Sequence, residues 1–252
     1  MTNAFETAVA AVRSLAAYVG VSLWVLVCGP PGMLLAMATG RPDALYVLGR
    51  MGVRIGLGAA GIRCRVAGRE HIQLDRAAVY CVNHASNVEP PILYMALAAL
   101  HPRLRILYKA QIHKLPVLGR AFDMAGFVPI ERRSPRRSMQ AIRQAAAAVR
   151  AGNSFLVFPE GTRSRTGELQ PFKPGVFLIA ARAGAPVVPV AIQGTRAAMR
   201  KGSPLVRPVT VSVRIGAPIE SAGEDGEGET TLMERTRAAV AELLEQGPVT
   251  DP

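Results

Sequence analysis

The sequence predicts an α/β fold in which a central, mostly parallel sheet is flanked by helices and follows an N-terminal hydrophobic, membrane-associating helical segment. Two observations lead to this fold class. Short apolar runs of strand length alternate with helical patterns along most of the chain, which is typical of a layered α/β domain. The chain has 252 residues, enough to bury a full core. We expect residues 1–60 to form the membrane-associating segment and residues 61–252 to form the α/β domain.

The N-terminal segment is defined by its lack of charge. No charged residue lies between Arg13 and Arg41, an interval of 27 positions from residue 14 to residue 40. As one helix it would measure about 40 Å, more than the roughly 30 Å of a hydrocarbon core. Residues 29–32 (GPPG) are expected to interrupt it. Three interpretations stay open: a tilted or kinked spanning helix, a hairpin or re-entrant pair within one leaflet, and a secretory signal peptide with a small-residue site at residues 36–38.

The remaining elements follow in order along the chain. A helix is expected over residues 44–57. Apolar runs then predict strands at residues 62–67, 77–82, 104–108, 127–130, 154–158, 187–192 and 209–215. Helical patterns lie between them at residues 91–100, 115–124, 138–150 and 175–183. An acidic loop at residues 221–229 leads to a capping-box pattern at residues 231–234, which predicts a last helix through residues 243–244.

The composition narrows the class of partner. The formal net charge is +12, and only four of the 30 basic residues are lysines. This balance suits an anionic membrane face or a phosphate-bearing substrate. Aromatic residues make up only 5%, which is little material for stacking bases, so no nucleic-acid partner is expected. Cys28, Cys64 and Cys81 are widely spaced and form no CxxC or His/Cys cluster. We therefore expect no disulfide framework, no metal and no cofactor.

The most informative motif is residues 83–91 (NHASNVEPP), at the exit of a predicted strand. In one helix His84 and Glu89 would lie about 140° apart. They can meet only if His84 is in the loop and Glu89 is in the first helical turn. There the helix dipole favours the carboxylate, which can then orient the imidazole of a general base. The alternative is a turn-capping histidine beside a solvated glutamate.

Three further motifs place basic groups at predicted strand ends, where open α/β sheets bind ligands. Residues 158–165 (FPEGTRSR) combine a glycine turn, a hydroxyl and two arginines. Gly161 allows the backbone to approach a ligand closely, and Arg163 can bind phosphate oxygens with two hydrogen bonds. Lys109 opens a second basic stretch, and Arg132 lies in a third. Each alone is most simply a solvated surface, but their convergence with the His/Glu pair indicates a site.

These motifs resemble, in order and spacing, the four motifs of the glycerolipid acyltransferases, most closely the bacterial 1-acyl-sn-glycerol-3-phosphate acyltransferases. The matching stretches are NHxxxxEP at residues 83–90, GFVPIER at residues 126–132, FPEGTRS at residues 158–164 and VVPV at residues 187–190. The resemblance therefore covers about residues 80–195. It implies that residues 61–252 form the acyltransferase domain.

The resemblance also implies a reaction. A fatty acyl group would pass from acyl-CoA or acyl-carrier-protein to the sn-2 hydroxyl of 1-acyl-glycerol 3-phosphate, giving phosphatidate at the cytoplasmic face of the bacterial inner membrane. The expected partners are thus a lysophospholipid acceptor, an acyl thioester donor and an anionic membrane surface. The alternative is a different acceptor, such as a lyso-ornithine lipid, glycerol 3-phosphate or another lysophospholipid.

Residue roles are carried over from the same motifs. His84 is the implied general base, which lets the acceptor hydroxyl attack the thioester directly, and Glu89 orients it. The implied substrate-binding residues are Lys109, Arg132, Glu160, Gly161, Thr162, Arg163 and Pro189. Among these, Arg163 is expected to hold the phosphate, Glu160 to organise its turn, and Pro189 to shape the donor or catalytic pocket. The chain departs from the family at Glu89, where aspartate is usual, and at Gln111, where an acidic residue is common.

Overall fold

A seven-stranded sheet forms the centre of the protein; the computed structural model describes residues 4–131, 133–221 and 229–250. Its strands are β1 (Ile62–Ala67), β2 (Val79–Val82), β3 (Leu104–Lys109), β4 (Val128–Ile130), β5 (Ser154–Val157), β6 (Val187–Gln193) and β7 (Val209–Ile215). Within the described residues their order is β1-β7-β6-β2-β5-β3-β4. Every neighbouring pair is parallel except β6–β7. The predicted fold class is therefore confirmed.

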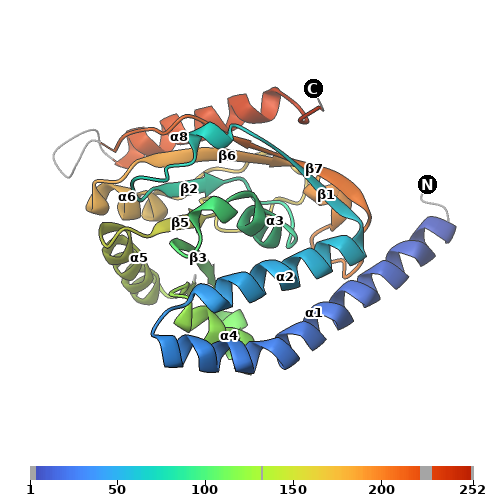
Figure 1. The fold of residues 1–252 in the computed structure, drawn as a ribbon. Coiled ribbons are helices and arrows are strands. Elements are labelled where there is room, and N and C mark those ends of the chain that lie inside the picture. The colour runs from blue at the N-terminus through green and yellow to red at the C-terminus, as the bar shows by residue number, and fades with distance from the viewer. Residues whose placement is uncertain (1–3, 132, 222–228, 251–252) are drawn as a thin grey trace.

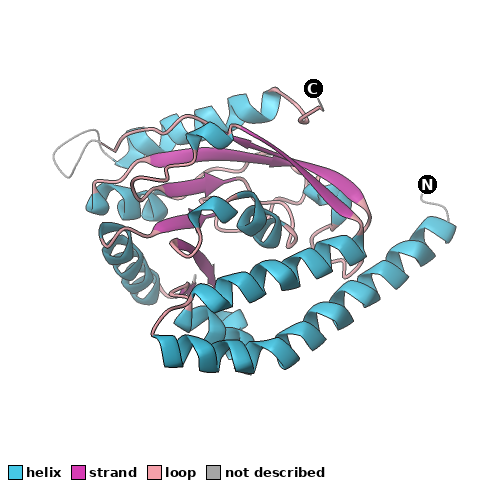
Figure 2. Cartoon of the chain, viewed as in Figure 1, coloured by secondary structure: helices cyan, strands magenta, loops and turns pink. Residues whose placement is uncertain are grey.

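Helices cover both faces of this sheet (Figures 1 and 2). They are α1 (Ala4–Thr39), α2 (Asp43–Ala60), α3 (Glu89–Ala96), α4 (Pro116–Met124), α5 (Pro135–Arg150), α6 (Phe177–Ala183), α7 (Thr195–Ala198) and α8 (Glu229–Glu245). Because side chains alternate along a strand, β2 sends Tyr80 and Val82 into the core under α2 and α3. Val79 and Cys81 enter the opposite core, under α5, α6 and α8.

The predicted helix starts differ from the observed ones by one to three residues, and two of these differences affect the interpretation. The helix expected at residues 91–100 begins earlier, at Glu89, and is divided by a separate 3₁₀ turn at Ala98–Leu100. The last helix begins at Glu229 rather than at a cap at Thr231. The predicted capping box is therefore wrong, because Thr231 already lies inside the helix. Most of the predicted acidic loop, residues 222–228, falls outside the described residues.

The predicted interruption at residues 29–32 is also wrong, because α1 continues through Pro30 and Pro31. Both prolines lie on the exposed side of the helix. The flanking glycines face the protein: a Cβ on Gly32 would lie 2.4 Å from a Leu48 methyl group. This close packing against α2 overrides the local helix-breaking tendency. The chain instead reverses at Gly40, whose φ of 66° suits glycine.

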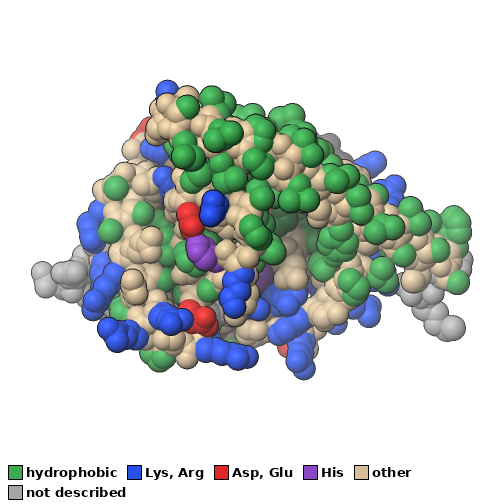
Figure 3. All heavy atoms as spheres, turned by 90° about the horizontal axis from the view of Figure 1, so that it is seen from below, with side chains coloured by type: hydrophobic (Ala, Val, Ile, Leu, Met, Phe, Trp, Pro, Cys, Tyr) green, Lys and Arg blue, Asp and Glu red, His purple; other side chains and the backbone are tan. Residues whose placement is uncertain are grey.

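The α1–α2 hairpin therefore lies against the α/β body as an antiparallel pair (Figure 1). α1 is long and apolar enough to cross a membrane by length and composition. Many large apolar side chains on it are exposed: Phe5, Val12, Leu15, Leu23, Leu26, Val27, Leu34, Leu35 and Met37. Viewed from below, hydrophobic side chains form one broad area, and Lys and Arg side chains gather beside it and around a hollow (Figure 3).

The sheet topology brings the ends of several strands to one edge. β6, β2, β5, β3 and β4 are parallel neighbours, so their carboxyl ends lie side by side. The NHxxxxEP motif follows β2 and the FPEGTRS motif follows β5, whereas GFVPIER contains β4 and VVPV lies within β6. Ligand sites of open α/β sheets form at this kind of edge.

Candidate active site

Asn83 fixes the turn that follows β2. Its side-chain amide donates to the Ile192 carbonyl at 3.0 Å, and its Oδ1 accepts from the Ile192 N–H at 2.8 Å. Asn83 thus extends the pairing of β2 with β6 by one residue beyond the last backbone pair, Val82 with Val190. The next residue, His84, leaves the sheet from a rigid base.

His84 and Glu89 form a hydrogen-bonded pair. His84 Nδ1 lies 2.6 Å from Glu89 Oε2. Val88 precedes α3, Glu89 is its first residue and prolines follow at the next two positions, so the carboxylate points back over the turn. This is the arrangement that helix geometry required of the sequence. The Glu89 side chain is fully buried, and the His84 side chain is 11% exposed.

The Glu89 carboxylate sits in a cradle of hydrogen-bond donors. Oε1 accepts from the N–H groups of Ala85 and Ser86, both at 2.9 Å, and from the Thr195 hydroxyl at 2.6 Å. Oε2 accepts from the Ala85 N–H at 3.1 Å besides contacting His84. These bonds satisfy a buried carboxylate that would otherwise be costly.

The cradle also sets the tautomer of His84. With both carboxylate oxygens acting as acceptors, Nδ1 must donate its proton to Oε2. Nε2 then carries the lone pair and is the nitrogen able to accept a proton. The imidazole ring is held by stacking on Phe158, with ring centroids 4.1 Å apart and planes at 29°. Orientation, tautomer and packing therefore suit His84 to act as a base.

The turn after β5 is fastened to the backbone of His84 on both sides. Glu160 Oε1 accepts the His84 N–H at 2.6 Å, and the His84 carbonyl accepts from the Ser164 N–H at 2.7 Å. Glu160 is 2% exposed. Burial raises its pKa to about 7, against the backbone N–H groups of His84 and Gln170, which lower it. Glu160 therefore holds the backbone of His84 against this turn.

We call residues 160–164, which follow β5, the basic turn. It bends at Gly161, whose φ is 70°. Lys201 reaches it from beyond β6: its ammonium donates to the Arg163 carbonyl at 2.8 Å and lies 3.3 Å from the Thr162 hydroxyl. The side chain of Lys173 runs along the other side, since a Cβ on Gly161 would lie 3.1 Å from its Nζ. The turn thus presents backbone, a hydroxyl and cationic groups together, as an anion site requires.

The remaining predicted site residues make no described contact with His84 or Glu89. Lys109 is exposed at the carboxyl end of β3, two strands from β2 along the same edge. Arg132 lies outside the described residues. Pro189 is buried within β6, opposite Cys81. By strand alternation it faces the core under α6 and α8, away from the face that contains Val188 and Val190. The structure therefore does not bring Pro189 against the His84 ring.

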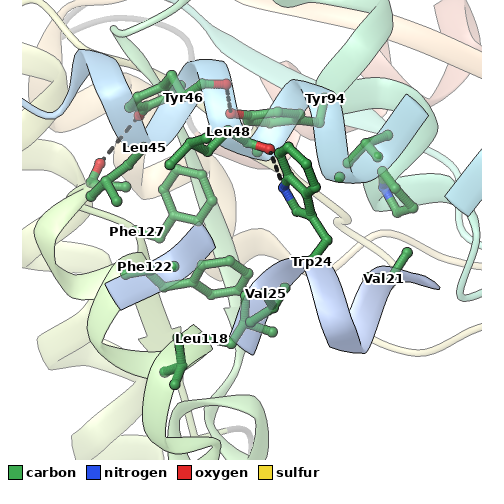
Figure 4. A pocket seen from close by; sticks show the side chains of 18 of the residues that line it. Val21, Trp24, Val25, Leu45, Tyr46, Leu48, Tyr94, Leu118, Phe122 and Phe127 are labelled. Carbon is green, nitrogen blue, oxygen red and sulfur yellow. Dashed lines mark hydrogen bonds between the residues drawn. The ribbon is translucent and has the colours of Figure 1, made fainter. Parts of the chain in front are cut away.

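An apolar cavity of about 260 Å³ lies between the hairpin, α3 and α4 (Figure 4). Pro90 and Pro91, which directly follow Glu89, form part of its wall. Two polar side-chain atoms of the lining already have hydrogen-bond partners on the backbone. Trp24 Nε1 donates to the Leu48 carbonyl at 3.0 Å, and the Tyr94 hydroxyl donates to the Tyr46 carbonyl at 3.2 Å. The cavity thus offers hydrocarbon surface next to the histidine pair.

Sequence reasoning missed two residues of this site. Thr195 opens α7 directly after Gly194, and its hydroxyl contacts Glu89 across 106 positions of the chain. A Gly-Thr pair after a buried strand was the available signal, though it is a common one. Lys201 lies in a loop with no motif around it, and only the fold brings it to Thr162.

Comparison with known proteins adds to this geometry. Residues 63–193 match the family described as Acyltransferase. The chain is 37% identical over 171 residues to a chloroplastic 1-acyl-sn-glycerol-3-phosphate acyltransferase of Brassica napus, covering 68% of this chain and 47% of that protein. It is 30% identical over 150 residues to a 1-acyl-sn-glycerol-3-phosphate acyltransferase of Borreliella burgdorferi, covering 60% of this chain and 59% of that protein.

The fold likewise has a solved counterpart. The crystal structure of the 1-acyl-sn-glycerophosphate acyltransferase from Thermotoga maritima superposes with a TM-score of 0.81, covering 97% of this chain and 99% of that chain at 23% identity. The chain spans about half the length of the curated plant relatives it matches. Because the match to the Thermotoga maritima structure covers 97% of this chain, the similarity of the fold includes the N-terminal hairpin.

Proposed function

Because this chain belongs to the acyltransferase family, we propose that it transfers a fatty acyl group from an acyl thioester to the sn-2 hydroxyl of 1-acyl-glycerol 3-phosphate, giving phosphatidate. The observation that carries the proposal is the His84–Glu89 pair, held in its cradle between a basic turn and an apolar cavity. Relatives with 30–37% identity bear the name of this activity. The donor is acyl-CoA or acyl-carrier-protein.

His84 acts as the general base in this proposal. Its Nε2 removes the proton of the acceptor hydroxyl while the hydroxyl oxygen bonds to the thioester carbonyl carbon. When the tetrahedral intermediate collapses, the C–S bond breaks and the imidazolium returns the proton to the departing thiolate. Glu89 stabilises the imidazolium through the 2.6 Å contact. No group of the protein becomes acylated.

The acceptor's phosphate is placed at the basic turn. Gly161 and Thr162 offer close backbone approach and a hydroxyl, and Arg163 a guanidinium. Because the Ser164 N–H donates to the His84 carbonyl, phosphate bound at this turn lies close to the base. Lys109 and Arg132 complete the positive field in the proposal: Lys109 ends β3 at this edge, and the assignment of Arg132 rests on its motif alone.

The apolar cavity is assigned to an acyl chain. Its lining includes Pro90 and Pro91, which directly follow Glu89, together with Trp24 of α1 and Phe122 of α4. Each methylene group buried there stabilises the complex by about 0.8 kcal/mol, so the cavity favours chains that fill it. The lipid substrate and the hairpin thus share one hydrophobic region.

Residues 1–60 seat the reaction at the membrane in this proposal, and residues 61–252 perform it. The α/β body contacts α1 at two places that are 15 residues apart along the helix. The Val206 N–H donates to Ser14 Oγ, and the Val117 side chain packs against Gly29. A perpendicular crossing by α1 would bury that body in hydrocarbon. The hairpin therefore lies along the bilayer with its exposed apolar face inserted. A basic surface around the hollow then faces the anionic headgroups of the cytoplasmic leaflet.

The test is substitution of His84 by Ala in the full chain. Phosphatidate formation should fall at least about 100-fold, while binding to vesicles stays unchanged. His71→Ala, which removes a histidine far from the cradle, should keep full activity. If His84→Ala retains activity, His84 is not the base. A panel of lyso-acceptors with both donors, with products identified by mass spectrometry, decides whether another acceptor is preferred.

A further inference from the structure

Lys201 is held at the basic turn by a segment that no motif includes. Residues 199–206 follow α7 and pass between the membrane hairpin and the active-site turns. The Met199 carbonyl accepts from the Ser86 hydroxyl at 2.8 Å. At the other end, the Val206 N–H donates to Ser14 Oγ of α1 at 2.7 Å. The segment is therefore fastened on both sides of Lys201.

The ammonium of Lys201 is itself fixed by the turn. It donates to the Arg163 carbonyl at 2.8 Å and lies within 3.3 Å of Thr162 Oγ1. An ammonium carries three N–H donors, so a third remains for a ligand. A lysine that is already ordered loses less freedom when it binds a ligand than one that moves freely in solvent.

Three basic residues contribute to the surroundings of this turn. Lys173 and Lys201 come from two segments outside the turn and bring their ammonium groups to Gly161 and to the Arg163 carbonyl, and Arg163 is part of the turn itself. Among the described residues, none of the three forms an ion pair. Neighbouring like charges repel, and a bound anion removes that cost. The arrangement is thus suited to an anionic group rather than to internal stability.

We propose that Lys201 binds the phosphate of the acceptor together with Arg163 and so selects acceptors that carry a phosphate monoester. This inference rests on the proposed function, which places that phosphate at the turn. A purely structural brace would need only one N–H donor to the Arg163 carbonyl. The full charge of Lys201 and its free donor have a use only when an anion is present.

The substitution Lys201→Gln removes the positive charge but keeps a hydrogen-bond donor, because the glutamine amide can still donate to the Arg163 carbonyl. In the full chain, the KM for 1-acyl-glycerol 3-phosphate should rise about tenfold, as expected for the loss of one charge-assisted hydrogen bond. The KM for the acyl donor and kcat should stay within about twofold of wild type, and Lys201→Arg should restore the acceptor KM. Arg143→Gln removes a charge from an exposed site on α5 and should change none of these values.

A binding measurement keeps this inference separate from the reaction. The affinity of the His84→Ala chain for 1-acyl-glycerol 3-phosphate, measured by calorimetry with and without Lys201→Gln, should fall about tenfold. Affinity for 1-acylglycerol, which lacks the phosphate, should stay the same. An unchanged phosphate-dependent affinity, or a rise in the donor KM instead, overturns the role of Lys201. Absence of phosphatidate formation by the wild-type chain, with this affinity difference intact, would overturn only the proposed reaction.

Discussion

Glu160 makes the stability of this protein depend on pH, and Glu160→Gln is expected to remove that dependence. The carboxyl group is 2% exposed and accepts the His84 N–H at 2.6 Å. Burial raises its pKa from 4.5 to about 7, although the amides of His84 and Gln170 oppose the rise; nearby Glu89 adds to it. Glutamine keeps the shape and an acceptor oxygen for the His84 N–H, but it cannot ionise.

The direction of this pH dependence follows from which state, folded or unfolded, binds the Glu160 proton more tightly. The folded state holds the Glu160 proton up to about pH 7, whereas the unfolded chain releases it near pH 4.5. Stability from this group is therefore complete below pH 4.5 and is lost as the pH rises to 7. The difference corresponds to about 3 kcal/mol, a large part of the stability of an ordinary domain.

Urea denaturation in nonionic detergent, followed by circular dichroism between pH 4 and pH 8, measures this effect. The free energy of unfolding of wild type minus that of Glu160→Gln should decrease by about 3 kcal/mol between pH 4.5 and pH 7. Glu168→Gln, which changes an exposed glutamate of the same loop, should give a flat difference. A flat difference for Glu160→Gln as well would refute the assigned pKa.

Three further predictions concern the cradle, the strand exit and the cavity. Thr195→Val removes the 2.6 Å donor to Glu89 and should lower kcat about tenfold with an unchanged circular dichroism spectrum; an unaltered kcat would show that the hydroxyl is dispensable. Asn83→Ala leaves the Ile192 amide and carbonyl without partners and should cost at least about 2 kcal/mol in urea denaturation; Asn153→Ala, in a half-exposed loop, is the comparison. Ala121→Phe fills the apolar cavity and should shift product acyl chains toward shorter lengths by mass spectrometry; unchanged chain lengths would place the acyl chain elsewhere.

The inner strands of the sheet could be predicted from the sequence because they are buried on both faces. Such strands appear as short apolar runs, and β5 and β6 lie within one residue of the predicted bounds. The hairpin could not be predicted from local rules. Residues 29–32 contain two glycines and two prolines, yet the helix continues because the glycines pack against other helices and the prolines face outward. That outcome depends on tertiary contacts that no local pattern contains.

The candidate site likewise combines features that local sequence determines with features that only tertiary contacts determine. The pairing of His84 with Glu89 follows from their spacing and a helix start, both of which are local. Thr195 reaches Glu89 across 106 residues only because β6 lies beside β2. Lys201 reaches Thr162 only because the segment after α7 crosses the same edge. Sequence spacing therefore predicted the His84–Glu89 pair, whereas the groups that hold this pair depend on strand order.

Strand order also explains how the chain accommodates a glutamate where the related motif usually has aspartate. The extra methylene moves the carboxylate about 1.5 Å further from α3. It thereby reaches the N–H groups of Ala85 and Ser86 as well as the Thr195 hydroxyl, all at 2.6–2.9 Å from Oε1. Oε2 then remains for His84, at 2.6 Å. Because α7 follows β6, the neighbour of β2 in the sheet, the Thr195 hydroxyl reaches the longer side chain from that neighbouring strand.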